Sequence, residues 1–144
     1  AALGTVIDAV LTEAGRGLIH TIGRDRPGPM NAWIGQRIFP GAYPPSLSEM
    51  MTVFEPMGFS VLDIENIRLH YAKTLEHWLA RYEANSERVK DMFDATFVRQ
   101  WRLYLAGALA AFTSGEMQLF QVVFNRHGNN QIPWTRDFLY WEQP

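Results

Sequence analysis

The sequence predicts an α/β fold, and three observations carry that prediction. Over residues 1–23, a helical pattern of apolar residues gives way to a glycine turn and a β-branched run. The middle, residues 70–114, holds two long segments with apolar side chains every three or four positions. Residues 117–124 then form a strand-like run. Helical and strand patterns that alternate along one chain are typical of α/β proteins.

Composition limits the functions that are open to this chain. With 144 residues, 47% of them hydrophobic, it has the material for a packed core. The absence of cysteine excludes disulfides, thiolate metal sites and a cysteine nucleophile from this chain. A formal net charge of −2 gives no overall positive field, so we expect no nucleic-acid partner. No apolar run approaches the roughly 20 residues of a membrane-spanning helix and no signal peptide opens the chain, so we expect a cytoplasmic protein.

The first predicted element is an amphipathic helix that extends to Gly15. Its apolar face has the spacing of one helix side and comprises Leu3, Val6, Ile7, Val10, Leu11 and Ala14. Gly17 then opens the apolar run of residues 18–22, which Gly23 closes and which is typical of a strand. Residues 24–32 contain two prolines and are expected to form a loop.

A capping box predicts where the next helix begins. Ser46 and Glu49 have the spacing at which a hydroxyl and a carboxylate each satisfy a free backbone amide at a helix start. Gly58 is expected to end this helix. Residues 59–65 then form the second predicted strand.

Two long helices are expected between residues 70 and 114. Their apolar faces comprise Tyr71, Leu75, Trp78, Leu79 and Tyr82 in the first helix and Val89, Phe93, Phe97, Trp101, Tyr104, Ala108 and Phe112 in the second. We call Phe93, Phe97, Trp101 and Tyr104 the aromatic stripe. The pattern favours a buried face for this stripe, and the wall of an acyl-chain tunnel is the alternative. A base-stacking platform is disfavoured, because no basic residues interleave that face.

His20 and Tyr71 are the candidate site residues that the pattern itself provides. His20 lies at the end of the first predicted strand, and ligands of open α/β sheets bind outside the carboxyl ends of strands. From the residues alone, a buried histidine with one hydrogen-bonded nitrogen is the favoured interpretation. Tyr71 begins a helix directly after the second strand, where a tyrosine is usually part of the core. The histidines lack metal-ligand spacing, and no glycine-rich nucleotide motif occurs.

Several blocks of sequence, taken together, resemble one protein family. They are residues 18–23, 33–34, 38–41, 45–47, 66–71 with Thr74, Leu75 and Trp78, 118–124, and 135–137. In this order and spacing, the chain resembles the cyclopropane-fatty-acyl-phospholipid synthases over nearly its whole length. These are S-adenosylmethionine-dependent methyltransferases that act on unsaturated acyl chains of membrane phospholipids or, in mycobacterial relatives, of mycolates.

The resemblance implies a Rossmann-type methyltransferase sheet of which residues 1–144 are the C-terminal part. In that scheme residues 1–23 are a helix and a strand, 59–65 and 117–124 are the closing antiparallel strands, and 70–114 are an inserted pair of long helices on the lipid side. The family's glycine-rich cofactor loop has no counterpart in this chain. We therefore expect S-adenosylmethionine to be bound mainly by residues upstream, and this chain alone to be inactive.

The resemblance also implies a bicarbonate site. The family's bicarbonate-binding histidine falls on His20, its backbone partner on Ile22, and its tyrosine on Tyr71. Methyl transfer from a sulfonium to an alkene leaves a carbocation that must lose a proton. Bicarbonate held by an imidazole, a backbone amide and a phenol can accept that proton. We expect His20 and Tyr71 to be catalytic and all three residues to bind bicarbonate.

The function implied is cyclopropanation or methylation of unsaturated fatty acyl chains of phospholipids, by a peripheral protein at the inner membrane face. Two alternatives stay open: a non-catalytic lipid-binding or dimerisation module of the same outline, and a related methyltransferase that acts on a different alkene. Part of a sheet exposes an open edge and apolar surface, so we expect self-association or a homodimer, which light scattering would detect.

Overall fold

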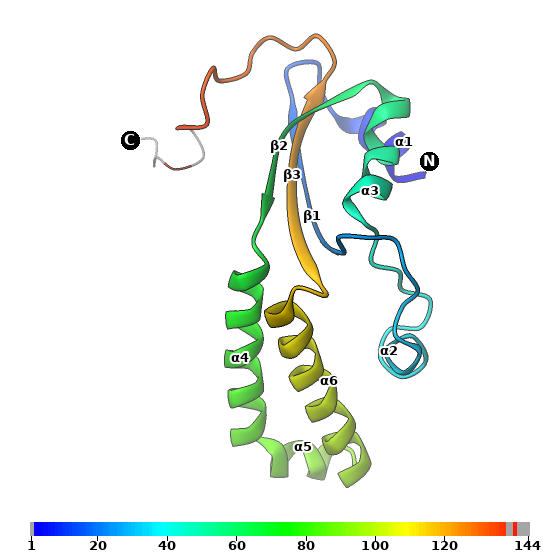
Figure 1. Cartoon of the computed structure of the whole chain (residues 1–144), viewed down its shortest axis with the longest axis vertical. Coiled ribbons are helices and arrows are strands. Elements are labelled where there is room, and N and C mark those ends of the chain that lie inside the picture. Colours follow the sequence, from blue (N-terminus) through cyan, green and yellow to red (C-terminus); the bar gives the residue numbers. More distant parts are fainter. Residues whose placement is uncertain (1, 138–139, 141–144) are drawn as a thin grey trace.

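A three-stranded sheet lies at the centre of the structure, a computed structural model that describes residues 2–137 and 140. Helices cover one face of the sheet and extend from one of its ends (Figure 1). The elements, in order, are α1 (Ala2–Val10), β1 (Arg16–Gly23), α2 (Ala32–Arg37), α3 (Leu47–Phe54), a 3-10 turn (Glu55–Met57), β2 (Phe59–Asn66), α4 (Arg68–Ala84), α5 (Ser86–Met92), α6 (Ala95–Ser114) and β3 (Gln118–Arg126). The predicted α/β class is confirmed.

β3 is the central strand and pairs antiparallel with both of its neighbours, in the order β1-β3-β2. β1 and β2 therefore run parallel to each other, and their carboxyl ends lie at the same end of the sheet. At that end Ile22 of β1 is opposite Leu119, and Asn66 of β2 is opposite Phe120. The pairing of β2 shifts between Val61 and Asp63, as in a β-bulge.

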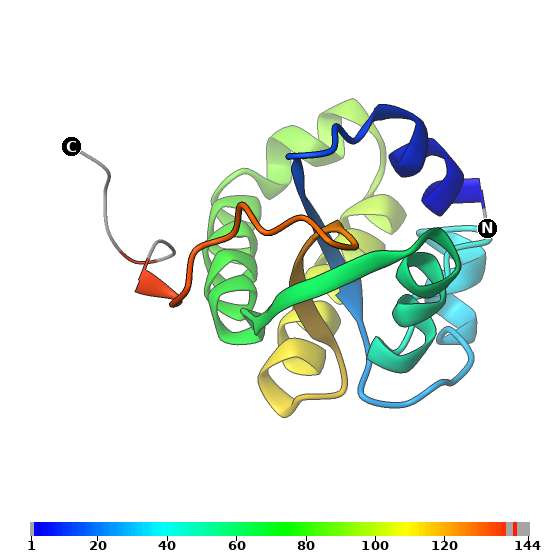
Figure 2. The ribbon, with the colours of Figure 1, turned by 90° about the horizontal axis from the view of Figure 1, so that it is seen from above.

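One face of the sheet is buried against α1 and α3 (Figures 1 and 2). The buried core on this face comprises Met50, Phe54, Phe59, Phe120, Val122 and Phe124. The rings of Phe54 and Phe59 have their centroids 5.0 and 5.4 Å from that of Phe124. Gly17 is required opposite Phe124, because a Cβ at this position would lie 2.3 Å from the phenylalanine ring.

A second core joins the end of the sheet to the antiparallel pair α4 and α6. It comprises Ala72, Leu75, Leu105, Phe112 and Leu119. Arg68 begins α4 and donates through Nη1 to the carbonyls of Phe112 and Thr113, at 2.6 and 3.0 Å, which satisfies free carbonyls at the end of α6. Farther along the pair, Arg102 donates to both carboxylate oxygens of Glu83, at 2.5 and 2.7 Å.

The predicted capping box is present at the start of α3. The Ser46 hydroxyl accepts from the Glu49 amide at 3.2 Å, and the Glu49 carboxylate accepts from the Ser46 amide at 2.8 Å. The Tyr43 hydroxyl donates a hydrogen bond to the same carboxylate at 2.8 Å. The Ser46 amide, and then the Tyr43 hydroxyl, lower the pKa of Glu49, so this carboxylate stays ionised and keeps the cap in place.

The prediction that the first helix extends to Gly15 is wrong, since α1 ends at Val10. Arg126 explains the early end. Its guanidinium donates to the carbonyls of Asp8 and Leu11, at 2.6 and 2.8 Å, and also binds the Asp8 carboxylate at 2.6 Å. Carbonyls at the end of the helix are satisfied from β3, so a further helical turn is not needed.

The prediction of one continuous second helix from Val89 is also wrong, because α5 ends at Met92 and α6 begins at Ala95. Asp94 lies between them in an extended conformation, and its carboxylate accepts from the Phe97 amide at 2.7 Å as an N-cap. The aromatic stripe is buried only in part, since Trp101 and Tyr104 pack against the second core. Phe93 is 58% exposed, and the buried face of α6 is formed by Val98, Leu105 and Phe112.

The second face of the sheet carries exposed side chains of β1. Leu18 is 56% exposed and His20 is also exposed, because alternate residues of a strand point away from the face that α3 covers. Arg136, from the segment after β3, pairs with Asp63 of β2. Among the described helices, none is long and apolar enough to cross a membrane.

The second core should carry much of the stability. Leu75 of α4 is fully buried, whereas Leu69 of the same helix is 62% exposed. We expect Leu75→Ala to lower the free energy of unfolding by about 2–5 kcal/mol, and Leu69→Ala to change it by less than about 0.5 kcal/mol. Urea denaturation of both variants measures the difference, and equal effects would contradict this packing.

Candidate functional site

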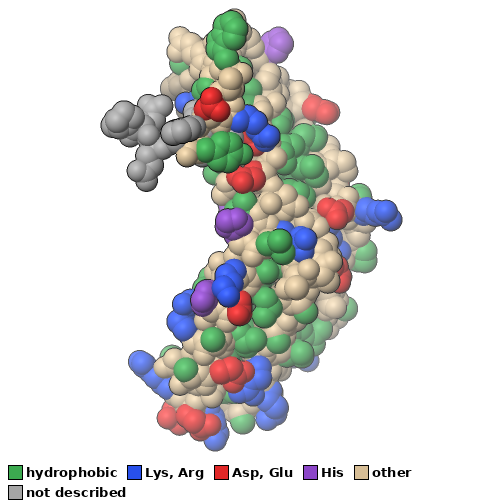
Figure 3. Space-filling view, turned by 60° about the vertical axis from the view of Figure 1, so that its left-hand side comes forward, with side chains coloured by type: hydrophobic (Ala, Val, Ile, Leu, Met, Phe, Trp, Pro, Cys, Tyr) green, Lys and Arg blue, Asp and Glu red, His purple; other side chains and the backbone are tan. Residues whose placement is uncertain are grey.

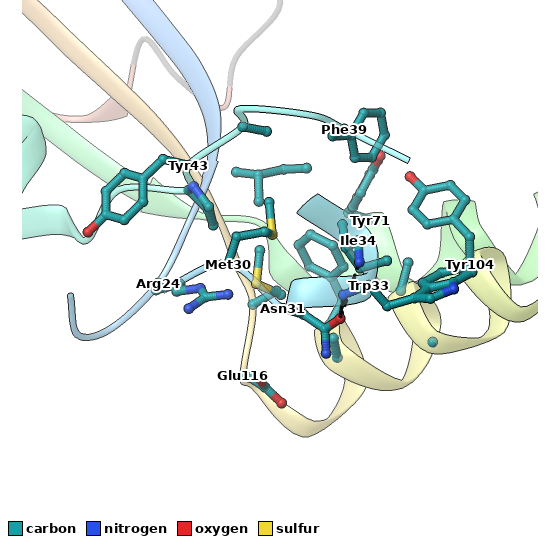
Figure 4. A pocket seen from close by; sticks show the side chains of 18 of the residues that line it. Arg24, Met30, Asn31, Trp33, Ile34, Phe39, Tyr43, Tyr71, Tyr104 and Glu116 are labelled. Carbon is teal, nitrogen blue, oxygen red and sulfur yellow. Dashed lines mark hydrogen bonds between the residues drawn. The ribbon is translucent and has the colours of Figure 1, made fainter. Parts of the chain in front are cut away.

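A cavity of about 660 Å³ opens at the carboxyl end of β1. Its walls come from β1, from the segment that contains α2, and from α4 and α6, as Figure 4 shows. Most of the wall is apolar, and it includes Ile22, Met30, Trp33, Ile34, Phe39, Tyr71, Tyr104, Ala108, Ala111, Phe112 and Met117. A cavity of this size and lining is suited to an apolar ligand.

The pairing of β3 brings Ile22 and Tyr71 to the same cavity. Leu119 lies opposite Ile22, and its carbonyl accepts from the Ile67 amide at 2.9 Å. The Ile67 carbonyl in turn accepts from the Tyr71 amide at 3.2 Å, which places Tyr71 in the first turn of α4. Two residues that are 49 positions apart in sequence therefore line one space.

Small residues of α6 provide the space on the opposite wall. Gly107, Ala108 and Ala111 all line the cavity, and Tyr104 lies one turn earlier on the same helix. A Cβ added to Gly107 would meet no atom within 4 Å. The cavity volume thus depends on short side chains at these positions of α6.

The segment between β1 and α3 supplies a wall that the sequence analysis did not identify. Asn31 caps α2 by accepting from the amides of Trp33 and Ile34, at 3.0 and 3.2 Å, and so fixes these side chains at the cavity. Phe39 packs edge-to-face against Tyr104, with the ring centroids 5.5 Å apart. Large apolar residues in a segment rich in proline and glycine were the sequence signal for this wall.

Tyr71 is held by aromatic neighbours. Its ring centroid lies 4.7 Å from that of Phe112 and 6.0 Å from that of Trp78, both in edge-to-face geometry. Burial raises the pKa of Tyr71, and burial followed by the nearby Tyr71 raises the pKa of Tyr104. Both phenols are therefore protonated at neutral pH and can donate hydrogen bonds into the cavity.

The structure brings two of the three predicted site residues to the cavity wall, Ile22 and Tyr71. His20 lies two positions before Ile22, on the same face of β1 and outside the cavity lining. Its Nδ1 is 3.1 Å from Nε2 of Gln121, the residue opposite it on β3. Gln121 thus fixes the orientation of the imidazole.

Charged groups are few in this cavity. Arg24 and Glu116 are the charged residues among those that line it. Arg24 donates through Nη1 to the Pro29 carbonyl at 2.6 Å, while its Nε is buried and has no hydrogen-bond partner among the described residues. Within residues 2–137 and 140, no group of three or more His, Asp or Glu side chains is suited to a metal ion.

A second, more open groove of about 550 Å³ continues from the cavity between α4 and α6. Phe39, Tyr71 and Tyr104 line both spaces. The remaining lining residues of the groove are Trp78, Arg81, Tyr82, Trp101 and Leu105. Trp101 and Tyr104 of the aromatic stripe therefore border this groove and also pack against the second core.

Comparison with known proteins shows what this chain resembles. The family model described as mycolic acid cyclopropane synthetase matches residues 3–122. A probable fatty acid methyltransferase of Pseudomonas putida is 35% identical over 124 residues, covering 84% of this chain and 32% of that protein. The cyclopropane-fatty-acyl-phospholipid synthase of Escherichia coli K12 is 33% identical over 132 residues, covering 91% of this chain and 34% of that protein.

A solved structure gives the same result. The mycolic acid cyclopropane synthase CmaA1, in complex with SAH and CTAB, superposes with a TM-score of 0.77 at 25% identity. The match covers 86% of this chain and 50% of CmaA1. The chain thus spans about a third of these curated relatives and half of the solved one. Because the family model covers most of its residues, the chain belongs to the mycolic acid cyclopropane synthetase family.

Proposed function

We propose that this chain forms the acyl-chain side of an S-adenosylmethionine-dependent methyltransferase that cyclopropanates or methylates unsaturated acyl chains of phospholipids. The observation that carries the proposal is the apolar cavity at which Ile22 and Tyr71 meet. The names of the relatives support an acyl substrate, and the SAH in CmaA1 supports the cofactor. Residues 70–114 are, on this proposal, the lipid-side insertion, and the protein works as a peripheral protein at the inner membrane face.

The cavity has the properties that an acyl chain needs. Its apolar walls take methylene groups out of water, which contributes about 0.8 kcal/mol for each one buried. The rings of Tyr71, Phe112 and Tyr104 surround the space next to Ile22, and aromatic faces stabilise positive charge. Exclusion of water and stabilisation of a cation are the two demands that methyl transfer to an alkene makes on its site.

The hydrogen-bonding groups beside the cavity fit a small oxyanion. Tyr71 keeps its proton because burial raises its pKa, and neither Ile22 nor the imidazole of His20 carries negative charge. When bound, S-adenosylmethionine supplies the methyl group and bicarbonate supplies the base that accepts a proton. On this proposal the Tyr71 hydroxyl and a backbone group of Ile22 bind the bicarbonate, together with the imidazole of His20. The contact between His20 Nδ1 and Gln121 Nε2, at 3.1 Å, supports a fixed position for that imidazole.

The direct test supplies the enzyme that contains this chain with an unsaturated phospholipid and S-adenosylmethionine labelled in its methyl group. We expect label in the lipid. His20→Ala and Tyr71→Phe should each lower kcat/KM by about 10²-fold or more, because each removes a hydrogen bond to the base. His77→Ala and Tyr140→Phe, at exposed positions, are the matched controls and should keep the wild-type rate.

Absence of label from the lipid would refute methyl transfer. Lipid binding without label would instead favour the non-catalytic lipid-binding module. The corresponding saturated phospholipid should stay unlabelled, since it has no alkene to attack.

Filling the cavity tests whether the acyl chain lies in it. Gly107→Phe places a ring in open space on α6, so we expect at least a tenfold loss of affinity for a fatty acyl ligand with an unchanged circular dichroism spectrum. Gly107→Ala leaves most of the volume and serves as the control. Equal affinities of the two variants would show that the chain binds elsewhere.

The raised pKa of Tyr71 makes a prediction about stability and pH. A raised pKa means that the folded state holds the phenol proton more tightly than the unfolded state does. The stabilisation that the phenol proton contributes to the folded state is complete below the ordinary pKa of 10.0. It is lost as the pH rises through the higher pKa that Tyr71 has in the folded state. The unfolding free energy of the wild type, measured in urea, should therefore fall relative to that of Tyr71→Phe above pH 10, and parallel curves would contradict the prediction.

A further inference from the structure

The groove beyond the cavity differs from the cavity in composition. Arg81 and six aromatic residues make up nearly all of its lining. The aromatic residues are Phe39, Trp78, Trp101 and the three hydroxyl-bearing residues Tyr71, Tyr82 and Tyr104. Tryptophan and tyrosine are the residues that favour the level of lipid head groups at a membrane surface. Apolar and charged side chains lie next to each other on the surface at this helical end of the molecule (Figure 3).

The charge of Arg81 is available to a ligand. Arg102 on the facing helix is paired with both oxygens of Glu83, and Arg68 binds the carbonyls that end α6. Within the described part of the chain, the guanidinium of Arg81 has neither an ion pair nor a hydrogen bond. An unpaired guanidinium beside aromatic rings is suited to a phosphate, which it can bind through two parallel hydrogen bonds.

The groove and the cavity lie in series along α4. Tyr71 and Arg81 are ten positions apart on this helix, a distance of about 15 Å at 1.5 Å per residue. Phe39, Tyr71 and Tyr104 form the boundary that both spaces share. A ligand that extends from Arg81 past Tyr71 thus passes from a polar, aromatic environment into an apolar one, as a phospholipid does from head group to acyl chain.

We propose that this groove binds the glycerophosphate head group of the phospholipid, with the phosphate on Arg81. The glycerol and the first acyl carbons lie against Trp78 and Trp101, and the chain continues past Tyr71 toward Ile22. The proposal rests on the proposed function and adds to it that recognition includes the phosphate. It also sets the depth of the reacting double bond, because α4 fixes the distance between phosphate and Tyr71.

Equilibrium binding without a methyl donor tests this subsite. The fluorescence of the wild-type chain, in which Trp78 and Trp101 lie in the groove, is titrated with a water-soluble diacyl phospholipid and with the diacylglycerol that has the same chains. We expect about fivefold tighter binding of the phospholipid, as suits one partly exposed ion pair. Arg81→Gln should abolish this preference and Arg81→Lys should keep part of it, with unchanged circular dichroism.

Arg88→Gln, on α5 and outside the groove, is the matched control and should keep the full preference. Inorganic phosphate alone should bind more weakly than the phospholipid. An Arg81→Gln chain that still prefers the phospholipid, a wild type without preference, or inorganic phosphate that binds as tightly as the lipid would each overturn this inference. Lack of methyl label in the lipid would overturn the proposed function, while leaving the phosphate preference measurable on its own.

Discussion

The central position of β3 is the constraint on which the rest of the structure depends. This strand is paired on both sides, and its side chains enter both cores: Phe120, Val122 and Phe124 on the face that α1 and α3 cover, and Leu119 at the end that α4 and α6 cover. Because side chains alternate along a strand, a shift of one residue in its pairing would turn each set toward the wrong face. The register of β3 is therefore strongly determined, and it brings the end of β1 next to the start of α4 at the site.

The site is a consequence of that register and of residue size on α6. Leu119 is opposite Ile22, and its carbonyl accepts a hydrogen bond from Ile67 at the start of α4. The end of β1 therefore lies beside the beginning of α4. Short side chains at Gly107, Ala108 and Ala111 then leave a space that the segment after β1 closes. The result is an apolar cavity next to a groove that is lined by aromatic rings and the guanidinium of Arg81.

Local signals in the sequence predicted much of the fold. The Ser46–Glu49 capping box and the three strands could be predicted because each depends on residues next to one another in the chain. The end of α1 could not, because it depends on Arg126, which is more than a hundred positions away. The break before α6 had a local signal, the N-capping Asp94, but the periodic apolar residues on both sides of it concealed that signal.

The candidate site was predictable only in part. The sequence pattern provided His20 and Tyr71 as candidates but favoured a structural interpretation for both. Their assignment to a bicarbonate site, together with Ile22, came from the resemblance to a family. Trp33 of the six-residue helix α2 and Phe39 just after it were missed because so short a segment has no period from which to infer burial. The core prediction for the aromatic stripe holds for Trp101 and Tyr104, which pack against the second core, and fails for the exposed Phe93. Helical spacing identifies a face of a helix and does not identify what covers it.

The most direct measurement of the central claim is a photocrosslinking map with a phospholipid that carries a diazirine near the middle of its acyl chain. If the cavity holds the acyl chain, mass spectrometry will find the label on its walls, at Ile22, Tyr71, Tyr104 or Ala108. Label spread instead over the exposed apolar residues Leu3, Val10 and Leu69 would contradict the account, since it would mean that the chain binds only to the outer surface.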